Sequence, residues 1–177
     1  MDTLAYKAYW HDVTKEVIPE SRTDWQPGDR AIFEKTKEAA LIVIINNIET
    51  DYEYDVAAIE VSAQKDGIFP IIVCGCGYMG CGGAYVEVSQ NEEGIVWKRF
   101  WQGQCGGEPL PEDDLKGLKA VATKNIYIKP PLRFPRRHYE AVIKNLLNEL
   151  RRHEDSFTYR EYQKSLEQYK TGNMARC

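Results

Sequence analysis

The sequence predicts a single α+β domain, in which an antiparallel β-meander is packed by two C-terminal helices. The length of 177 residues fits one domain. Short β-branched runs separated by turn residues occupy the middle of the chain, and the final third has the spacing of amphipathic helices. We therefore expect one domain over 1–177, with a polar N-terminal segment at 1–28, a mixed region with the central meander at 29–134 and two helices within 135–172.

The region before the meander contains a change of periodicity. A Pro-Gly-Asp motif at 27–29 is typical of a turn. Intrinsic propensity favours a helix over 31–40, and the β-branched run at 41–45 favours a buried strand. Alternation and helical spacing overlap further on, and we expect a short helix near 55–64.

Three β-branched runs make up the predicted meander. They cover 69–73, 84–89 and 95–101, and the turn residues from Asn91 to Gly94 separate the last two. A further strand is expected at 125–129, because two prolines follow it directly and cannot continue a ladder.

The last third predicts two helices. The first begins near Pro135 and places an apolar stripe towards the core, formed by Tyr139, Val142, Ile143, Leu146, Leu147 and Leu150. In the second helix, Thr158 and Glu161 match a capping box, and Gly172 can end the helix. Its narrower stripe of Tyr159, Tyr162, Leu166 and Tyr169 is interpreted as core-facing aromatic packing.

The charge of the chain is unevenly distributed. The net charge is −4, but residues 1–60 carry 6 basic and 13 acidic side chains, whereas residues 121–177 carry 12 basic and 6 acidic ones. An acidic face raises the rate of encounter with basic partners. The overall acidity argues against sequence-independent nucleic-acid binding, which needs clustered lysine and arginine.

The compartment expected from the sequence is the cytoplasm. The longest apolar run, at 39–45, is too short to cross a bilayer, and the first ten residues lack the basic-then-apolar layout of a secretory signal. We expect no membrane partner. In a reducing cytosol, the five cysteines are expected as thiols or metal ligands rather than disulfides.

Three cysteines and five glycines crowd residues 74–83, between two predicted strands. A tight connection with small, partly buried thiols is the favoured interpretation. The alternative is structural zinc, because four thiolates complete a closed tetrahedral site; its ligands are Cys74, Cys76, Cys81 and Cys105. A reactive thiol is a third interpretation, although the histidines are distant in sequence. The segment also spells a dinucleotide-binding glycine pattern, but a strand follows where that motif needs a helix.

The sequence C-G-C-G-Y-M-G-C-G-G at 74–83, followed by the strand pair and Trp97, resembles a group of small bacterial proteins that carry C-x-C-G-x-x-G-C-x-G. The Pro-Leu-Arg-Phe run at 131–134 and the helix after it are also similar to that group. The resemblance covers the second half of the chain. It implies a small cytoplasmic protein of the kind often encoded beside toxins as immunity proteins.

Charged and aromatic side chains provide the other candidate sites. Carboxylates at Asp51, Glu53 and Asp55 could meet a basic partner, and solvated surface charge is the plainer interpretation. Trp97 is expected on the face opposite Phe100, so one face of the meander would be core and the other would be exposed. Exposed aromatic side chains are typical anchors for a partner, and the candidates here are Trp97 and Trp101. An anion site is possible near the start of the first C-terminal helix, at Arg133, Arg136 and Arg137.

The function expected from these features is that of a binding protein, with an immunity protein that neutralises a basic toxin domain as the leading hypothesis. Electrostatic steering would make such an association fast and salt-sensitive. This hypothesis requires no turnover and no cofactor. The alternatives are a cysteine-dependent enzyme and a zinc-stabilised adaptor, which thiol titration and elemental analysis distinguish.

Overall fold

The computed structural model describes residues 1–17, 32–74, 84–102 and 130–171. These residues form one α+β domain with a seven-stranded antiparallel sheet whose strand order follows the chain. The strands are β1 (Leu4–Val17), β2 (Ile32–Ile45), β3 (Ile48–Tyr54), β4 (Gly67–Cys74), β5 (Ala84–Gln90), β6 (Gly94–Gln102) and β7 (Leu132–Pro135). The predicted fold class is therefore confirmed, and the meander extends over the whole sheet.

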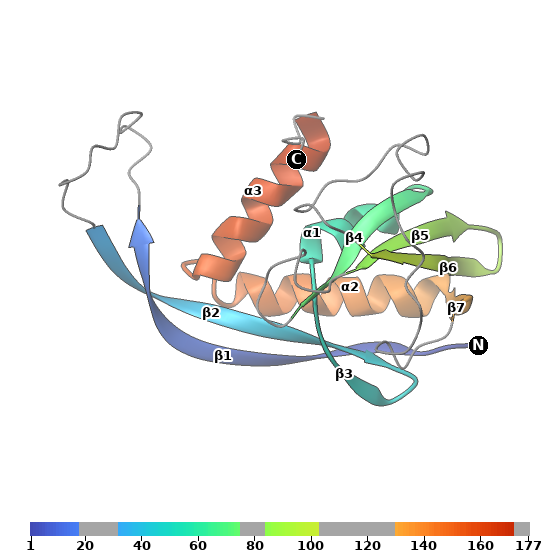
Figure 1. Ribbon diagram of the computed structural model, residues 1–177, viewed down its shortest axis with the longest axis horizontal. Helices are drawn as coiled ribbons and strands as arrows, with labels where there is room; N and C mark the ends of the chain where they lie inside the picture. The colour runs from blue at the N-terminus through green and yellow to red at the C-terminus, as the bar shows by residue number, and fades with distance from the viewer. Residues whose placement is uncertain (18–31, 75–83, 103–129, 172–177) are drawn as a thin grey trace.

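Three helices accompany the sheet: α1 (Val56–Ser62), α2 (Arg136–Arg151) and α3 (Phe157–Thr171). The predicted helix near 55–64 is confirmed as α1, and the helix entered near Pro135 is confirmed as α2. Helix α2 lies against the sheet, and α3 rises from its end beside β2 (Figure 1). Side chains from α2 and from most strands meet in one core, which includes Trp97, Phe134, Tyr139 and Leu146.

Strand β2 overturns the prediction of a helix over 31–40. All fourteen of its residues pair with β1, from Val17↔Ile32 to Leu4↔Ile45. This long ladder satisfies the backbone groups on the facing edges of the two strands and outweighs the local helix propensity. The polar segment predicted at 1–28 accordingly contains strand β1. We call residues 11–17 and 32–38 the arm; the ends of these two strands, towards Val17 and Ile32, project past the helices (Figure 1).

The two ends of the sheet meet at residue 2. The Asp2 N–H donates to the Arg133 carbonyl at 2.8 Å, and the Asp2 carboxylate accepts from the Arg133 N–H at 2.7 Å. The next contact along this edge is made by His138 of α2, whose Nε2 lies 2.9 Å from the Leu4 nitrogen and 2.8 Å from the Leu4 oxygen. The start of β1 is thus fixed to both β7 and α2.

A β-bulge in β6 overturns the prediction that Trp97 and Phe100 lie on opposite faces. Glu87 pairs with Arg99, but Val88 pairs with Trp97, so Lys98 is an extra residue. The extra residue shifts the alternation by one position. Trp97 and Phe100 therefore both enter the core, with ring centroids 6.1 Å apart, while Lys98 is exposed between them.

The N-terminus of α3 also differs from the predicted capping box. Ser156, not Thr158, is the cap, and its Oγ accepts from the Tyr159 N–H at 3.1 Å. Thr158 has a tertiary contact instead, since its Oγ1 accepts from the Ala39 N–H of β2 at 2.8 Å. The predicted packing of the tyrosine stripe is confirmed, because Tyr159, Tyr162 and Tyr169 pack against the core.

Candidate acidic cleft

A cleft of about 260 Å³ lies where β2 continues beyond the end of β3. Pairing between these strands runs only from Ile45↔Ile48 to Ile42↔Glu53. From Leu41 towards its N-terminal end, β2 therefore has an edge that β3 does not cover. The first turns of α3 approach this edge, and the start of α1 closes the opposite side (Figure 1). We call this hollow the acidic cleft, because four carboxylate residues line it: Glu38, Glu53, Asp55 and Glu161.

Glu53 is half-buried at the end of β3 and lies against the exposed edge of β2. Burial raises the pKa of its carboxyl, and the negative charge of Glu38 raises it further. A hydrogen bond from the Leu41 N–H and the proximity of His11 act in the opposite direction. The Glu53 carboxylate therefore accepts from the N–H of Leu41, which lies just beyond the last backbone pair between β2 and β3.

Asp55 is held in the cleft by its role as the N-cap of α1. Its Oδ1 accepts from the Ala58 N–H at 2.9 Å. Burial raises the pKa of Asp55 to about 6, although hydrogen bonds from the backbone of Ala58 and Ala57 lower it. A carboxyl with this pKa changes its charge just below neutral pH.

The four carboxylates differ in their counter-charges. Glu38 lies 2.9 Å from the Lys15 ammonium and 3.7 Å from His11 Nε2, and Glu161 lies 4.0 Å from Lys164. Within the part of the chain that the structure describes, neither Glu53 nor Asp55 forms an ion pair with lysine or arginine. Among the described residues, these two carboxylates thus have no lysine or arginine as a counter-charge, and an ammonium or guanidinium group would compensate them.

Aromatic side chains complete the lining, with Phe157 and Tyr162 from α3 and Tyr54 from β3. The Tyr162 hydroxyl donates to Glu60 at 2.8 Å, and the Lys15 ammonium lies 4.5 Å above the centre of the Phe157 ring. Aromatic faces attract cations through the ring quadrupole. The Phe157 ring therefore already has a cation of this chain as its neighbour.

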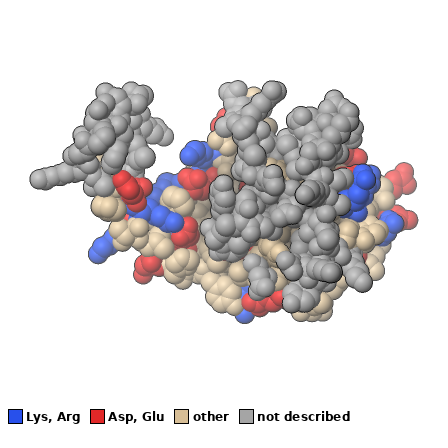
Figure 2. Space-filling view, viewed as in Figure 1, with Lys and Arg blue, Asp and Glu red and all other residues tan. Residues whose placement is uncertain are grey.

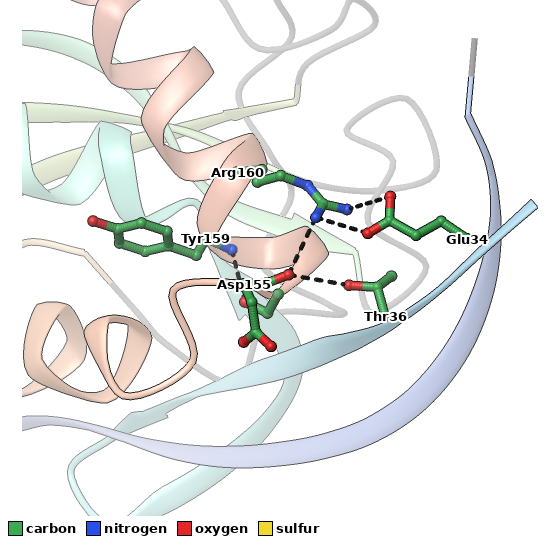
Figure 3. Close-up of polar contacts among 6 residues, drawn as sticks. Glu34, Thr36, Asp155, Tyr159 and Arg160 are labelled. Atoms are coloured by element: carbon green, nitrogen blue, oxygen red, sulfur yellow. Dashed lines mark hydrogen bonds and ion pairs between the residues drawn. The ribbon is translucent and has the colours of Figure 1, made fainter. Parts of the chain in front are cut away.

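Helix α3 is fixed to the arm by polar contacts beside the cleft. Arg160 reaches from the first turn of α3 to Glu34 on β2, with distances of 3.0 Å and 3.3 Å between paired nitrogen and oxygen atoms (Figure 3). Its Nη1 also donates to the Asp155 carbonyl at 3.1 Å, and the Thr36 hydroxyl donates to the same oxygen at 3.5 Å. These contacts set the position of the α3 wall relative to β2.

The acidic and basic portions of the chain meet rather than separate. Figure 2 shows basic and acidic side chains next to one another on the arm, and Arg160 of the basic portion pairs with Glu34 of the acidic portion. At this contact, the charges of the two portions therefore compensate each other.

The structure brings together some of the predicted site residues. Glu53 and Asp55 share the cleft, whereas Asp51 belongs to β3 and its side chain lies outside the described residues. Trp97 is fully buried and cannot form an exposed anchor, so its predicted role in partner binding is wrong. Trp101 lies in β6, and its side chain is outside the described set.

The predicted anion site has one of its three guanidinium groups already engaged. Arg136 donates to Gln90 at 3.0 Å and lies 3.9 Å from Glu140, while Arg133 and Arg137 are exposed. The predicted zinc site falls outside the described residues at Cys76, Cys81 and Cys105, and Cys74 ends β4 with its side chain likewise outside them. The described residues contain no cluster of potential metal ligands.

Sequence reasoning missed two of the four cleft carboxylates. Glu38 lay in the predicted helix over 31–40, and Glu161 was assigned to a capping box. The run from Glu34 to Glu38 is polar at every position, so it carries no apolar–polar alternation that would indicate a strand.

Comparisons with protein families, with curated proteins and with solved structures found no match. Among the described helices, none has the length and apolar character needed to span a membrane.

Proposed function

We propose that this chain is a cytoplasmic binding protein of the immunity type, which neutralises a bacterial toxin domain by accepting one of its basic side chains in the acidic cleft. The observation that supports the proposal is the pair of enclosed carboxylates, Glu53 and Asp55, without a lysine or arginine partner in the described part of the chain. A guanidinium or ammonium group from a partner would supply the missing charge.

The proposed recognition has two contributions. The carboxylates attract a basic surface from a distance, which speeds encounter and makes the association rate fall with salt. At short range, the cleft removes water from the inserted side chain, so that each charged hydrogen bond becomes stronger than at an open surface. The chemistry requires binding alone and no reaction.

The test uses a basic toxin domain, encoded beside this protein or co-purified with it, as the measured partner. The double variant Glu53→Gln/Asp55→Asn removes both charges, but glutamine can still accept from the Leu41 N–H and asparagine still caps a helix well. We expect affinity to fall at least about thirtyfold, or roughly 2 kcal/mol.

The matched control is Glu92→Gln/Glu93→Gln, which removes two charges from the exposed turn between β5 and β6. It changes the net charge equally but leaves the cleft intact, so affinity should change less than about threefold. Equal losses in the two double variants would mean that overall charge, not the cleft, controls the association.

A further inference from the structure

Lys15 of the arm brings a positive charge to the rim of the acidic cleft. Its ammonium lies 2.9 Å from Glu38 Oε1 and 4.5 Å above the centre of the Phe157 ring. Both of these residues line the cleft, and they come from β2 and α3. A cation of the chain itself therefore occupies a carboxylate and an aromatic ring that belong to the cleft.

The register of the arm shows that the Lys15 side chain extends towards the cleft. In the strand pair, Lys15 lies directly opposite Glu34, which binds Arg160 of α3 (Figure 3). Glu38 lies opposite His11, which is four residues from Lys15 along β1, or about 13 Å between backbone positions. The ion pair between Lys15 and Glu38 therefore requires the lysine to extend along the arm to the cleft residue.

Glu38 is the carboxylate for which Lys15 and a basic guest would compete. Its negative charge reaches Glu53, because it raises the pKa of the Glu53 carboxyl. A basic side chain bound at Glu53 would therefore be attracted by Glu38 as well. Lys15 already holds Glu38 Oε1, and His11 Nε2 lies 3.7 Å from Oε2. Like charges repel strongly at short range in a partly enclosed site, so the guest and Lys15 exclude each other from Glu38.

The contact between Lys15 and Glu38 is suited to exchange. The Lys15 side chain is 32% exposed and the Glu38 side chain is 30% exposed, so water reaches both partners. An ion pair with this exposure contributes little to stability, because the charges are screened and two flexible side chains lose entropy. Displacement of Lys15 therefore returns its ammonium to water without unfolding the arm.

We propose that Lys15 is an internal competitor of the acidic cleft, which occupies the Glu38 side in the free protein and is displaced by the basic side chain of a partner. The inference rests on the proposed function, since it requires a basic side chain to enter the cleft. Lys15 sets the selectivity of the site, because a guest has to exceed the contacts that Lys15 makes with Glu38 and Phe157. A guest without a positive charge does not displace it.

Lys7 provides a matched control on the same strand. Its ammonium also pairs with a glutamate, at 3.3 Å from Glu49, and also lies over an aromatic ring, 4.9 Å from the centre of Tyr9. Neither Glu49 nor Tyr9 is among the described residues that line the cleft. The variants Lys15→Met and Lys7→Met therefore remove the same charge and the same kinds of contact, and only Lys15→Met changes the cleft.

The binding test uses N-acetyl-arginine methylamide, a probe with one guanidinium group and no amine, followed by the amide NMR shifts of Ala57 and Ala58 at low salt. We expect the native protein to bind it with a dissociation constant below about 10 mM. Lys15→Met should bind at least about fivefold more tightly, because the competing cation is gone. Lys7→Met, and Lys15→Arg with its retained charge, should stay within about twofold of the native affinity. Circular dichroism and the melting temperature confirm that the variants are folded.

Displacement itself is measured by reductive methylation of the lysine amines with and without saturating probe. The probe should speed methylation of Lys15 at least about threefold, because the amine leaves its charged hydrogen bond with Glu38. Methylation of Lys7 should not change. In Glu53→Gln/Asp55→Asn the probe should bind at least about tenfold more weakly, which assigns its site to the cleft.

Two outcomes would overturn this inference and leave the proposed function standing. These are probe binding in the cleft of the native protein with unchanged methylation of Lys15, and equal affinities of Lys15→Met and Lys7→Met. Two other outcomes would overturn the proposed function as well. These are no probe binding by either the native protein or Lys15→Met, and probe binding that Glu53→Gln/Asp55→Asn does not weaken.

Discussion

The indole N–H of Trp97 donates to the hydroxyl of Tyr139 at 3.1 Å, and both side chains are fully buried. The same hydroxyl lies 2.8 Å from Ser62 Oγ, which donates to the Ile59 carbonyl at 2.8 Å. This chain of bonds links β6, α2 and α1 through the core. The tryptophan that was predicted as an exposed anchor therefore has a structural role.

Replacing Tyr139 with phenylalanine should destabilise the fold. Tyr139→Phe leaves the buried Trp97 N–H without its acceptor, and an unsatisfied buried group costs about 1–3 kcal/mol. Urea denaturation measures the loss. In the double variant with Trp97→Phe, the two losses should not add, because the donor and the acceptor disappear together. Strict additivity would show that the hydrogen bond contributes nothing.

The cap of α3 can be separated from its tertiary contact. Ser156→Ala should cost about 1 kcal/mol in unfolding free energy, because the Tyr159 N–H loses its acceptor. Thr158→Val should cost a similar amount for a different reason, since it leaves the Ala39 N–H unbonded. Glu161→Ala should change stability by less than about 0.5 kcal/mol. A loss for Glu161→Ala as large as for Ser156→Ala would mean that Thr158 and Glu161 form the predicted capping box.

The stability of the protein should fall as pH rises from about 4 to 6. The folded pKa of Asp55 is about 6, above the value near 3.9 of a free aspartate, so the folded state binds more protons in this window. The contribution of Asp55 to stability is complete below its pKa in the unfolded state and is lost above its pKa in the folded state. Asp55→Asn keeps the cap and should flatten this part of the profile. Identical profiles for the two proteins would refute the assignment.

Arg160 should control the opening of the arm more than global stability. Arg160→Lys loses the two-pronged contact with Glu34, and both partners are about two-fifths exposed, so the global loss should stay below about 1 kcal/mol. Amide exchange at Thr36 and Lys37 should nevertheless accelerate. The charge swap Glu34→Lys/Arg160→Glu should restore part of the protection. Unchanged exchange in Arg160→Lys would mean that other contacts hold the arm.

The features predicted correctly from the sequence are those set by local chemistry. The turn from Asn91 to Gly94 is an example, since the Asn91 side chain accepts from the Glu93 and Gly94 amides at 3.0 and 2.9 Å. Strand β2 could not be predicted in this way, because its stability comes from pairing with residues 4–17. The position of Trp97 depends on the bulge at Lys98, which alternation alone does not reveal.

The candidate site also contains residues that local sequence could identify and residues that only the tertiary fold brings in. Glu53 and Asp55 are close in sequence, and their shared location was within reach of a sequence argument. Glu38 and Glu161 join them only because β3 ends early and α3 lies against the uncovered edge of β2. The charge of the cleft is therefore a tertiary property.

The most direct test of the acidic cleft is the proton balance of binding at pH 6. A basic side chain beside Asp55 lowers the pKa of that carboxyl from about 6, so complex formation should release up to about half a proton from it. Calorimetry in buffers of different ionisation enthalpy measures this release. We expect proton release for the native protein and a clear reduction of that release in Asp55→Asn. Complex formation at pH 6 with no proton exchange, equal in both proteins, would contradict this expectation.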